Sequence, residues 1–103
     1  MLSMIESFAD KATEDVFNGL NSTEARRRLP KDLWRIAFRK LDQIDSAVQI
    51  GDLRVPPGNR LELLKGDRVG QHSIRTNSQY RICFEWTEIG ANGVEIVDYH
   101  SVE

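Results

Sequence analysis

The sequence has very little cysteine and no long apolar run. Cys83 is the only cysteine in 103 residues, which excludes an internal disulfide and a cysteine-based zinc site. No apolar stretch approaches the ~20 residues that a membrane-spanning helix needs, so we expect no membrane association. Glu6 and Asp10 stand where a secretory signal would carry a basic start and an apolar segment. We therefore expect a cytoplasmic location.

Several common catalytic and binding motifs are also missing. The sequence contains no P-loop, no GxGxxG pattern, and no group of carboxylates or histidines at metal-ligand spacing. We therefore expect neither a metal nor another cofactor. No segment shows the pattern of a DNA-reading helix, so direct contact with DNA is not expected either.

Charge is nearly balanced over the chain but unevenly distributed along it. The net charge is −2. Residues 1–25 carry −4 and residues 82–103 carry −5, whereas residues 26–81 carry +7, with 13 Lys and Arg against six acids. Such segregation allows a basic surface on a mildly acidic protein, and an ordinary mixed surface is the alternative.

The chain length suits one domain, residues 1–103, with a modest hydrophobic core. Residues 4–8 predict a short first strand, and Asp10 predicts the start of a helix of about two turns that stops near Gly19. Pro30 suits the first turn of a second helix that runs to about Ser46. Its apolar stripe recurs at three- and four-residue steps, through Leu33, Ile36, Ala37, Leu41 and Ile44.

The residue pattern of the second half of the chain predicts β-strands. Two prolines and a glycine within residues 55–59 predict an ordered loop. Strands are expected over residues 61–64, 70–76, 79–86 and 94–99, with turns at 77–78 and 88–93. The prediction is an α+β fold, in which two N-terminal helices pack on a small, mainly antiparallel sheet with a first strand at the N-terminus.

Groups able to act on a phosphodiester gather on this predicted sheet, namely Lys65, Arg68, Arg75, Arg81, Asp98, Tyr99 and His100. Cleavage of RNA without a metal requires a base for the ribose 2′-hydroxyl, an acid for the 5′-oxygen, and cations near the phosphate. His100 is an imidazole that titrates near neutral pH. Arg81 alternates with Tyr80, Ile82 and Phe84, so its side chain should point away from the core.

Each of these residues also has a plain structural interpretation. Lys65 could be a turn residue, Arg81 could pair with an acid, and Tyr99 could be packing. His100 could be an unremarkable surface residue, and His72 is expected to be structural. The basic run at residues 26–28 suits a helix cap or linker, with contact to RNA or to an acidic segment of a partner protein as the alternative.

Five motifs together resemble the HigB toxins of the RelE/ParE superfamily. They are Val-Pro-Pro-Gly-Asn-Arg-Leu-Glu at 55–62, Leu-Lys-Gly-Asp-Arg at 64–68, Ser-Ile-Arg at 73–75, Tyr-Arg-Ile-Cys-Phe at 80–84, and Val-Glu-Ile-Val-Asp-Tyr-His at 94–100. The resemblance implies a RelE-like microbial RNase fold. It also implies a ribosome-dependent, metal-independent cut in translated mRNA in the A site, through a 2′,3′-cyclic phosphate. The implied partners are the 70S ribosome, mRNA and a HigA-type helix-turn-helix antitoxin, which alone contacts operator DNA.

The resemblance also implies roles for particular residues. Matched by position, the catalytic residues are Lys65, Arg81, Asp98, Tyr99 and His100, and the RNA-binding residues are Arg68 and Arg75. The chain departs from some relatives at Glu62, where they carry a histidine, and at Gln79, where they carry an asparagine. The first departure favours His100, helped by Lys65 or by the ribosome, over a scheme with two histidines.

Two other functions remain open at this point. A ParE-like protein shares the fold but inhibits DNA gyrase by binding. A catalytically inactive relative would act only by binding an antitoxin and regulating the operon.

Overall fold

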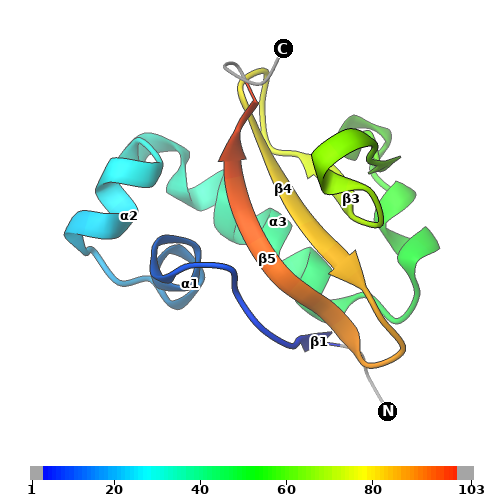
Figure 1. Cartoon of the computed structure of the whole chain (residues 1–103). Helices are drawn as coiled ribbons and strands as arrows, with labels where there is room; N and C mark the ends of the chain where they lie inside the picture. Colours follow the sequence, from blue (N-terminus) through cyan, green and yellow to red (C-terminus); the bar gives the residue numbers. More distant parts are fainter. Residues whose placement is uncertain (1–3, 100–103) are drawn as a thin grey trace.

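A computed structural model describes residues 4–99 of the chain and has a five-stranded sheet at its centre (Figure 1). The strands are β1 Met4–Ile5, β2 Glu62–Leu63, β3 His72–Arg75, β4 Tyr80–Trp86 and β5 Gly90–Asp98. Their order across the sheet is β1-β5-β4-β3-β2. β1 runs parallel to β5 and every other neighbouring pair is antiparallel, so the predicted α+β fold with a mainly antiparallel sheet is confirmed.

Three helices precede most of the sheet, where two were predicted. They are α1 Lys11–Asn18, α2 Thr23–Arg28 and α3 Trp34–Ser46. Asp10 caps α1 by accepting the Thr13 N–H, and Ser22 caps α2 in the same way. Pro30 precedes a 3₁₀ turn, Lys31–Leu33, that leads into α3, so the second predicted helix begins slightly later than expected.

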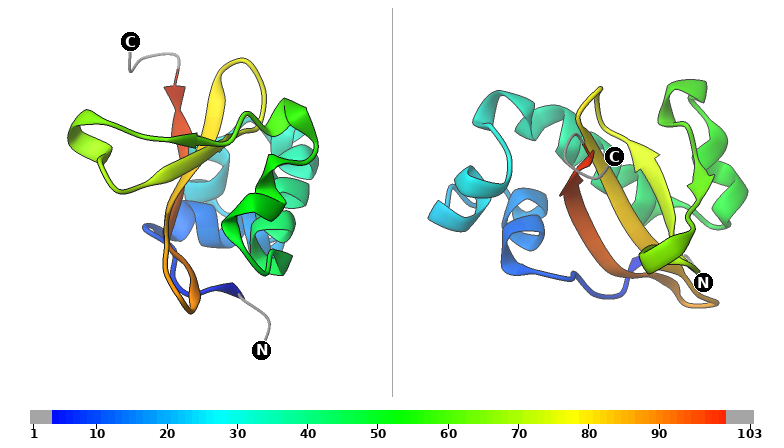
Figure 2. Two further views of the ribbon diagram at one scale, coloured as in Figure 1. Left: turned by 90° about the vertical axis from the view of Figure 1, so that its right-hand side faces the viewer. Right: turned by 45° about the horizontal axis from the view of Figure 1, so that its top comes forward.

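The helices and the loop of residues 64–71 lie on opposite sides of the sheet (Figure 2). Figure 2 shows α3 on one side and the loop of residues 64–71 arching out on the other. The core fills the space between the helices and the sheet, and its largest fully buried members are Phe84, Leu29, Leu41, Ile44, Leu53, Ile74, Ile82 and Ile96. Within residues 4–99 the loop side carries no α-helix, and it is called the open face below (Figure 2). No helix within the described residues is long and apolar enough to cross a membrane.

Residues 50–60 form the ordered loop that their prolines and glycines predict. They contain the 3₁₀ turns Ile50–Arg54 and Pro57–Asn59. The fully buried Asn59 amide holds the loop together by donating to the Leu53 carbonyl at 3.1 Å and to the Gln43 side chain at 3.1 Å. Arg60 follows in a left-handed conformation with φ of 47°. The chain thereby turns into β2 with the Arg60 carbonyl directed at the sheet.

The predicted turn at residues 88–93 was wrong for its second half, because β5 begins at Gly90 rather than at Val94. The turn is shorter and is closed by the Thr87 hydroxyl, which accepts the N–H groups of Ile89 and Gly90. Gly90 pairs with Met4 of β1, and a Cβ at Gly90 would lie 1.9 Å from the Met4 carbonyl oxygen. This glycine therefore permits close approach of β1 rather than a turn.

Candidate active site

The open face of the sheet carries the polar side chains of β3, β4 and β5. Neighbouring residues of a strand point to opposite faces, so burial of Tyr80, Ile82 and Phe84 in the core directs Arg81 and Cys83 to the open face. The prediction that Arg81 points away from the aromatic core is confirmed by its contact with Ser73, the residue that pairs with Cys83 across β3 and β4.

Arg81 is held rigidly although it carries a charge. Its Nε donates to the Ser73 hydroxyl oxygen at 2.7 Å, and its Nη2 donates to the Arg60 carbonyl at 2.7 Å. Nη2 also lies 3.5 Å from a carboxylate oxygen of Glu62. With 8% of the residue exposed, the guanidinium keeps a fixed direction that a flexible surface arginine would lack.

Tyr99 lies directly over this arginine. The guanidinium carbon of Arg81 is 5.4 Å from the centre of the Tyr99 ring, which is a cation–π contact. The backbone N–H of Tyr99 donates to the Gln79 carbonyl at 2.7 Å and fixes the chain where β5 ends. The ring therefore lies on the open face beside a buried positive charge.

A pocket of about 220 Å³ opens next to Tyr99 and is lined by Leu64, Lys65, Asp67, Arg68 and Tyr99. The loop of residues 64–71 forms one wall, closed at its base by the Leu64 N–H donating to the Gln71 carbonyl at 2.8 Å. Lys65 is exposed, and the 3₁₀ turn Gly66–Arg68 follows it. Two cations and an aromatic ring around one cavity suit a phosphate with a base attached.

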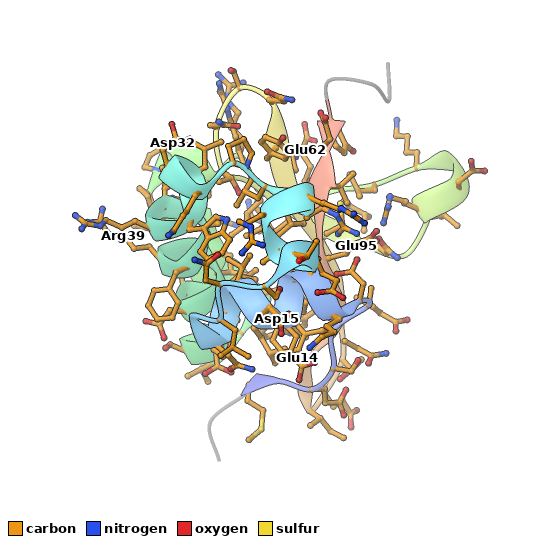
Figure 3. The ribbon with its side chains drawn as sticks, turned by 90° about the vertical axis from the view of Figure 1, so that its left-hand side faces the viewer. Glu14, Asp15, Asp32, Arg39, Glu62 and Glu95 are labelled. Atoms are coloured by element: carbon orange, nitrogen blue, oxygen red, sulfur yellow. The ribbon has the colours of Figure 1, made fainter. Side chains whose placement is uncertain are left out.

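Arg68 joins the loop to the sheet. It donates to the Gln71 side chain at 3.0 Å and pairs with Glu95 of β5 at 3.2 Å. Figure 3 shows Glu95 on the side of β5 away from α3. Arg68 therefore lies over the open face, beside the pocket that Lys65 also lines.

Cys83 lies beneath these charges and is fully buried. Burial raises the pKa of its thiol, and this effect outweighs the lowering by Arg68 and Arg81. The thiol therefore stays protonated and is unsuited to act as a nucleophile.

Arg75 lies opposite Arg81 on the open face but does not line the pocket, and Asp98 does not line it either. The backbones of Arg75 and Arg81 lie opposite each other in the register of β3 and β4. The Arg75 Nε donates to the Asn77 carbonyl in the hairpin turn at 3.0 Å. In the register of β4 and β5, Asp98 lies opposite Tyr80 and not opposite Arg81. The Asp98 carboxylate accepts a hydrogen bond from the Gln79 side chain at 3.2 Å. Burial and the charge of Asp98 together raise the pKa of the Tyr80 hydroxyl.

The structure thus brings together most of the sequence-predicted site. Lys65, Arg68, Arg81 and Tyr99 share the open face, whereas strand alternation places Asp98 on the other face of β5. His100 lies outside the described residues. Sequence reasoning gave no role to Ser73, and treated Glu62 only as a departure from relatives. The period-two pattern places Ser73 and Arg81 on the same face, but their contact also depends on the register between β3 and β4.

The other histidine and the basic run have structural surroundings. His72 stacks on Phe84 with ring centres 6.4 Å apart, and burial lowers the pKa of its imidazole. Arg28 donates to Asp10 at 2.7 Å and to the Ile96 carbonyl at 2.9 Å, which ties α2 to α1 and to the sheet. The Arg26 guanidinium donates a hydrogen bond to the side-chain oxygen of Asn21, just before α2, at 2.7 Å.

A helix-covered, mainly antiparallel sheet with an anchored arginine, a tyrosine and a basic pocket on its open face has the architecture of a RelE-like toxin domain. The family described as "RelE-like toxin of type II toxin-antitoxin system HigB" matches residues 6–100. The chain therefore belongs to the HigB-like toxin family. A type II toxin has an antitoxin as its partner, so membership also supplies one partner for this chain.

Individual relatives agree with this assignment. The chain is 40% identical to "Toxin HigB-1" of Vibrio cholerae over 85 residues, which cover 82% of this chain and 86% of the relative. It is 36% identical to "Endoribonuclease HigB" of Proteus vulgaris over 98 residues, which cover 94% of this chain and all of the relative. An uncharacterized protein of Haemophilus influenzae is 37% identical over 78 residues, or 76% of each chain.

Proposed function

We propose that this toxin is a ribosome-dependent, metal-independent endoribonuclease that cuts translated mRNA in the A site and thereby stops translation and growth. The observation that carries the proposal is the fixed Arg81 guanidinium under Tyr99, beside the pocket lined by Lys65. The printed name of the Proteus vulgaris relative supports the same reaction. Cytoplasmic action follows from this proposal, since translating ribosomes are the target.

In the proposed reaction the ribose 2′-oxygen attacks the adjacent phosphorus and the bond to the 5′-oxygen breaks. The products are a 2′,3′-cyclic phosphate and a 5′-hydroxyl. Lys65 and Arg81 offset the negative charge that grows on the phosphate oxygens. Tyr99 stacks on a splayed base of the mRNA or positions a ribose hydroxyl. His100 exchanges protons with the reacting oxygens and Asp98 orients it, as the matched motif implies.

The proposed partners divide between activity and control. The 70S ribosome presents the mRNA, and Arg68 and Arg75 contact mRNA or rRNA phosphates. A HigA-type helix-turn-helix antitoxin binds the toxin, holds it inactive and represses the operon. The toxin itself reaches operator DNA only through that antitoxin.

The test is primer extension on a translated mRNA incubated with the purified toxin, with and without 70S ribosomes. Cuts within codons that require ribosomes are the expected result. Absence of cuts by folded protein in both conditions would refute the proposal. A supercoiling assay with DNA gyrase in parallel would then reveal a gyrase inhibitor, and harmless overexpression without antitoxin would indicate an inactive relative.

A further inference from the structure

Asp67 is a carboxylate on the wall of the pocket beside Tyr99, and the reaction described above assigns no role to it. It belongs to the loop of residues 64–71 that arches out over the open face (Figure 2). The residue is exposed, and among residues 4–99 its side chain forms no hydrogen bond or ion pair. Both of its oxygen atoms are therefore free to accept hydrogen bonds from a ligand in the pocket.

A structural role does not account for this carboxylate. The 3₁₀ turn Gly66–Arg68 is held by its backbone, since the Arg68 N–H donates to the Lys65 carbonyl at 3.3 Å and the Val69 N–H to the Gly66 carbonyl at 3.1 Å. No side chain caps the turn. A negative charge also repels RNA phosphates, which Lys65 and Arg68 attract. A carboxylate in a pocket for RNA should therefore face a base, because bases offer N–H donors.

The hydrogen-bonding groups of the pocket distinguish one base from another. Lys65 and Arg68 can only donate, and within the described part of the chain Asp67 is the only carboxylate that lines the pocket. A carboxylate accepts through two oxygens, so it matches a base edge with two adjacent donors. Guanine has such an edge, formed by N1–H and N2–H. Adenine and cytosine each place one amino donor beside a ring-nitrogen acceptor, and uracil has one N–H between two carbonyls.

We propose that Asp67 is a specificity-determining residue that selects guanine in the mRNA, by accepting hydrogen bonds from N1 and N2 of the base that stacks on Tyr99. This inference rests on the proposed function. The pocket volume of about 220 Å³ lies below the range of about 300–1,000 Å³ found for drug-sized ligands, so it suits a single base. A good bidentate contact between a side chain and a base discriminates against the wrong base by about 5- to 150-fold.

The experiment measures single-turnover cleavage of mRNAs bound to 70S ribosomes, with A-site codons that differ in one nucleotide at a time. Guanine, inosine and adenine are placed in turn at each codon position. At one position the wild type should cut the guanine mRNA about 5- to 150-fold faster than the adenine mRNA. Inosine keeps N1–H but lacks the N2 amino group, so its rate should lie between the two.

Asp67→Asn should change the preference and not merely the rate. The asparagine amide has one donor and one acceptor, which match N1 and N6–H of adenine. The ratio of guanine to adenine rates should therefore fall to about one or below, by the same 5- to 150-fold factor. Asp32→Asn is the matched control and should keep the wild-type ratio. Asp32 is also the exposed middle residue of a 3₁₀ turn, Lys31–Leu33, and does not line the pocket.

A rate ratio within one protein does not change when stability or ribosome affinity changes for all substrates alike. If Asp67→Asn alters the guanine and adenine rates by the same factor, the carboxylate only repels the RNA backbone and the inference is overturned. A wild type without preference for guanine at any codon position overturns it as well. In both cases ribosome-dependent cuts by the wild type still uphold the proposed function. A wild type that cuts none of these mRNAs overturns both.

Discussion

Arg81 on β4 and Tyr99, the residue that follows β5, meet on the open face, with the guanidinium carbon 5.4 Å from the ring centre. The arginine is fixed from below by Ser73 and Arg60, and the tyrosine is fixed through its own backbone. A ring held over a fixed cation offers a flat platform to an RNA base. The pair therefore links base stacking and phosphate binding within one contact.

This arrangement predicts different results for two substitutions of Tyr99. Base–aromatic stacking is worth about 1–3 kcal/mol, so Tyr99→Ala should weaken toxin activity on ribosome-bound mRNA by roughly 5- to 150-fold. Tyr99→Phe keeps the ring and the cation–π contact and should retain most of the activity. Single-turnover cleavage rates over a range of toxin concentrations measure both effects. Equal loss in the two variants would show that the hydroxyl, rather than stacking, is what matters.

Ser73 should matter for stability as well as for activity. It is fully buried, and its hydroxyl oxygen accepts the Arg81 Nε–H at 2.7 Å. Ser73→Ala leaves that donor without a partner in a buried position, which costs about 1–3 kcal/mol of unfolding free energy. Urea unfolding followed by circular dichroism gives this value. Ser78→Ala, on the exposed hairpin turn, is the control and should change little. No difference between the two variants would refute the anchoring role.

The Asp10–Arg28 pair should make stability depend on pH. Burial raises the pKa of the Asp10 carboxyl, but the Thr13 N–H and Arg28 more than offset it, so the pKa lies below its ordinary value of 3.8. A lowered pKa gives stability that is present above the unfolded-state pKa and is lost as pH falls through the folded-state pKa. Arg28→Met should destabilise the protein by about 1–3 kcal/mol at neutral pH.

The difference between wild type and Arg28→Met should shrink below about pH 4, because Asp10 becomes protonated in both proteins. The bond from Arg28 to the Ile96 carbonyl is lost at every pH, so a constant part of the difference should remain. Urea unfolding at a series of pH values measures this change. Arg27→Met is the matched control on the same helix and should show no such trend. A difference independent of pH would contradict the role of Asp10.

The sequence allowed the sheet, α1 and α3 to be predicted because their apolar residues recur at regular steps. α2 escaped prediction because it is six residues long, buries only Ala25, and contains three consecutive arginines. Its place is set by Arg28 reaching Asp10 and Ile96, contacts between segments far apart in the chain. The start of β5 was missed for a similar reason, since glycine at Gly90 is needed by the neighbouring β1.

Some residues of the candidate site could likewise be predicted from the sequence, and others could not. Arg81 could be assigned to the open face from alternation alone, and Lys65, Arg68 and Tyr99 followed from family motifs. The role of Ser73 and the position of Glu62 could not, because they depend on the register between β2, β3 and β4. Strand pairing is a long-range property, and a short β2 of two residues carries too little pattern to fix it.

Lys65 gives a direct test of the pocket. It is exposed on the pocket wall, and in the proposed reaction it stabilises charge that develops on the phosphate. Lys65→Met keeps the side-chain length and removes the charge. Loss of one such group costs about 10²–10³-fold in the catalysed rate, so the maximal single-turnover rate should fall by that factor. Ribosome binding should fall much less, because phosphate contacts spread over the whole surface set that affinity. Lys31→Met, an exposed lysine before α3, is the matched control and should keep the wild-type rate. If both variants lose the same activity, nonspecific attraction to RNA explains the effect, and Lys65 has no special place at the reacting phosphate.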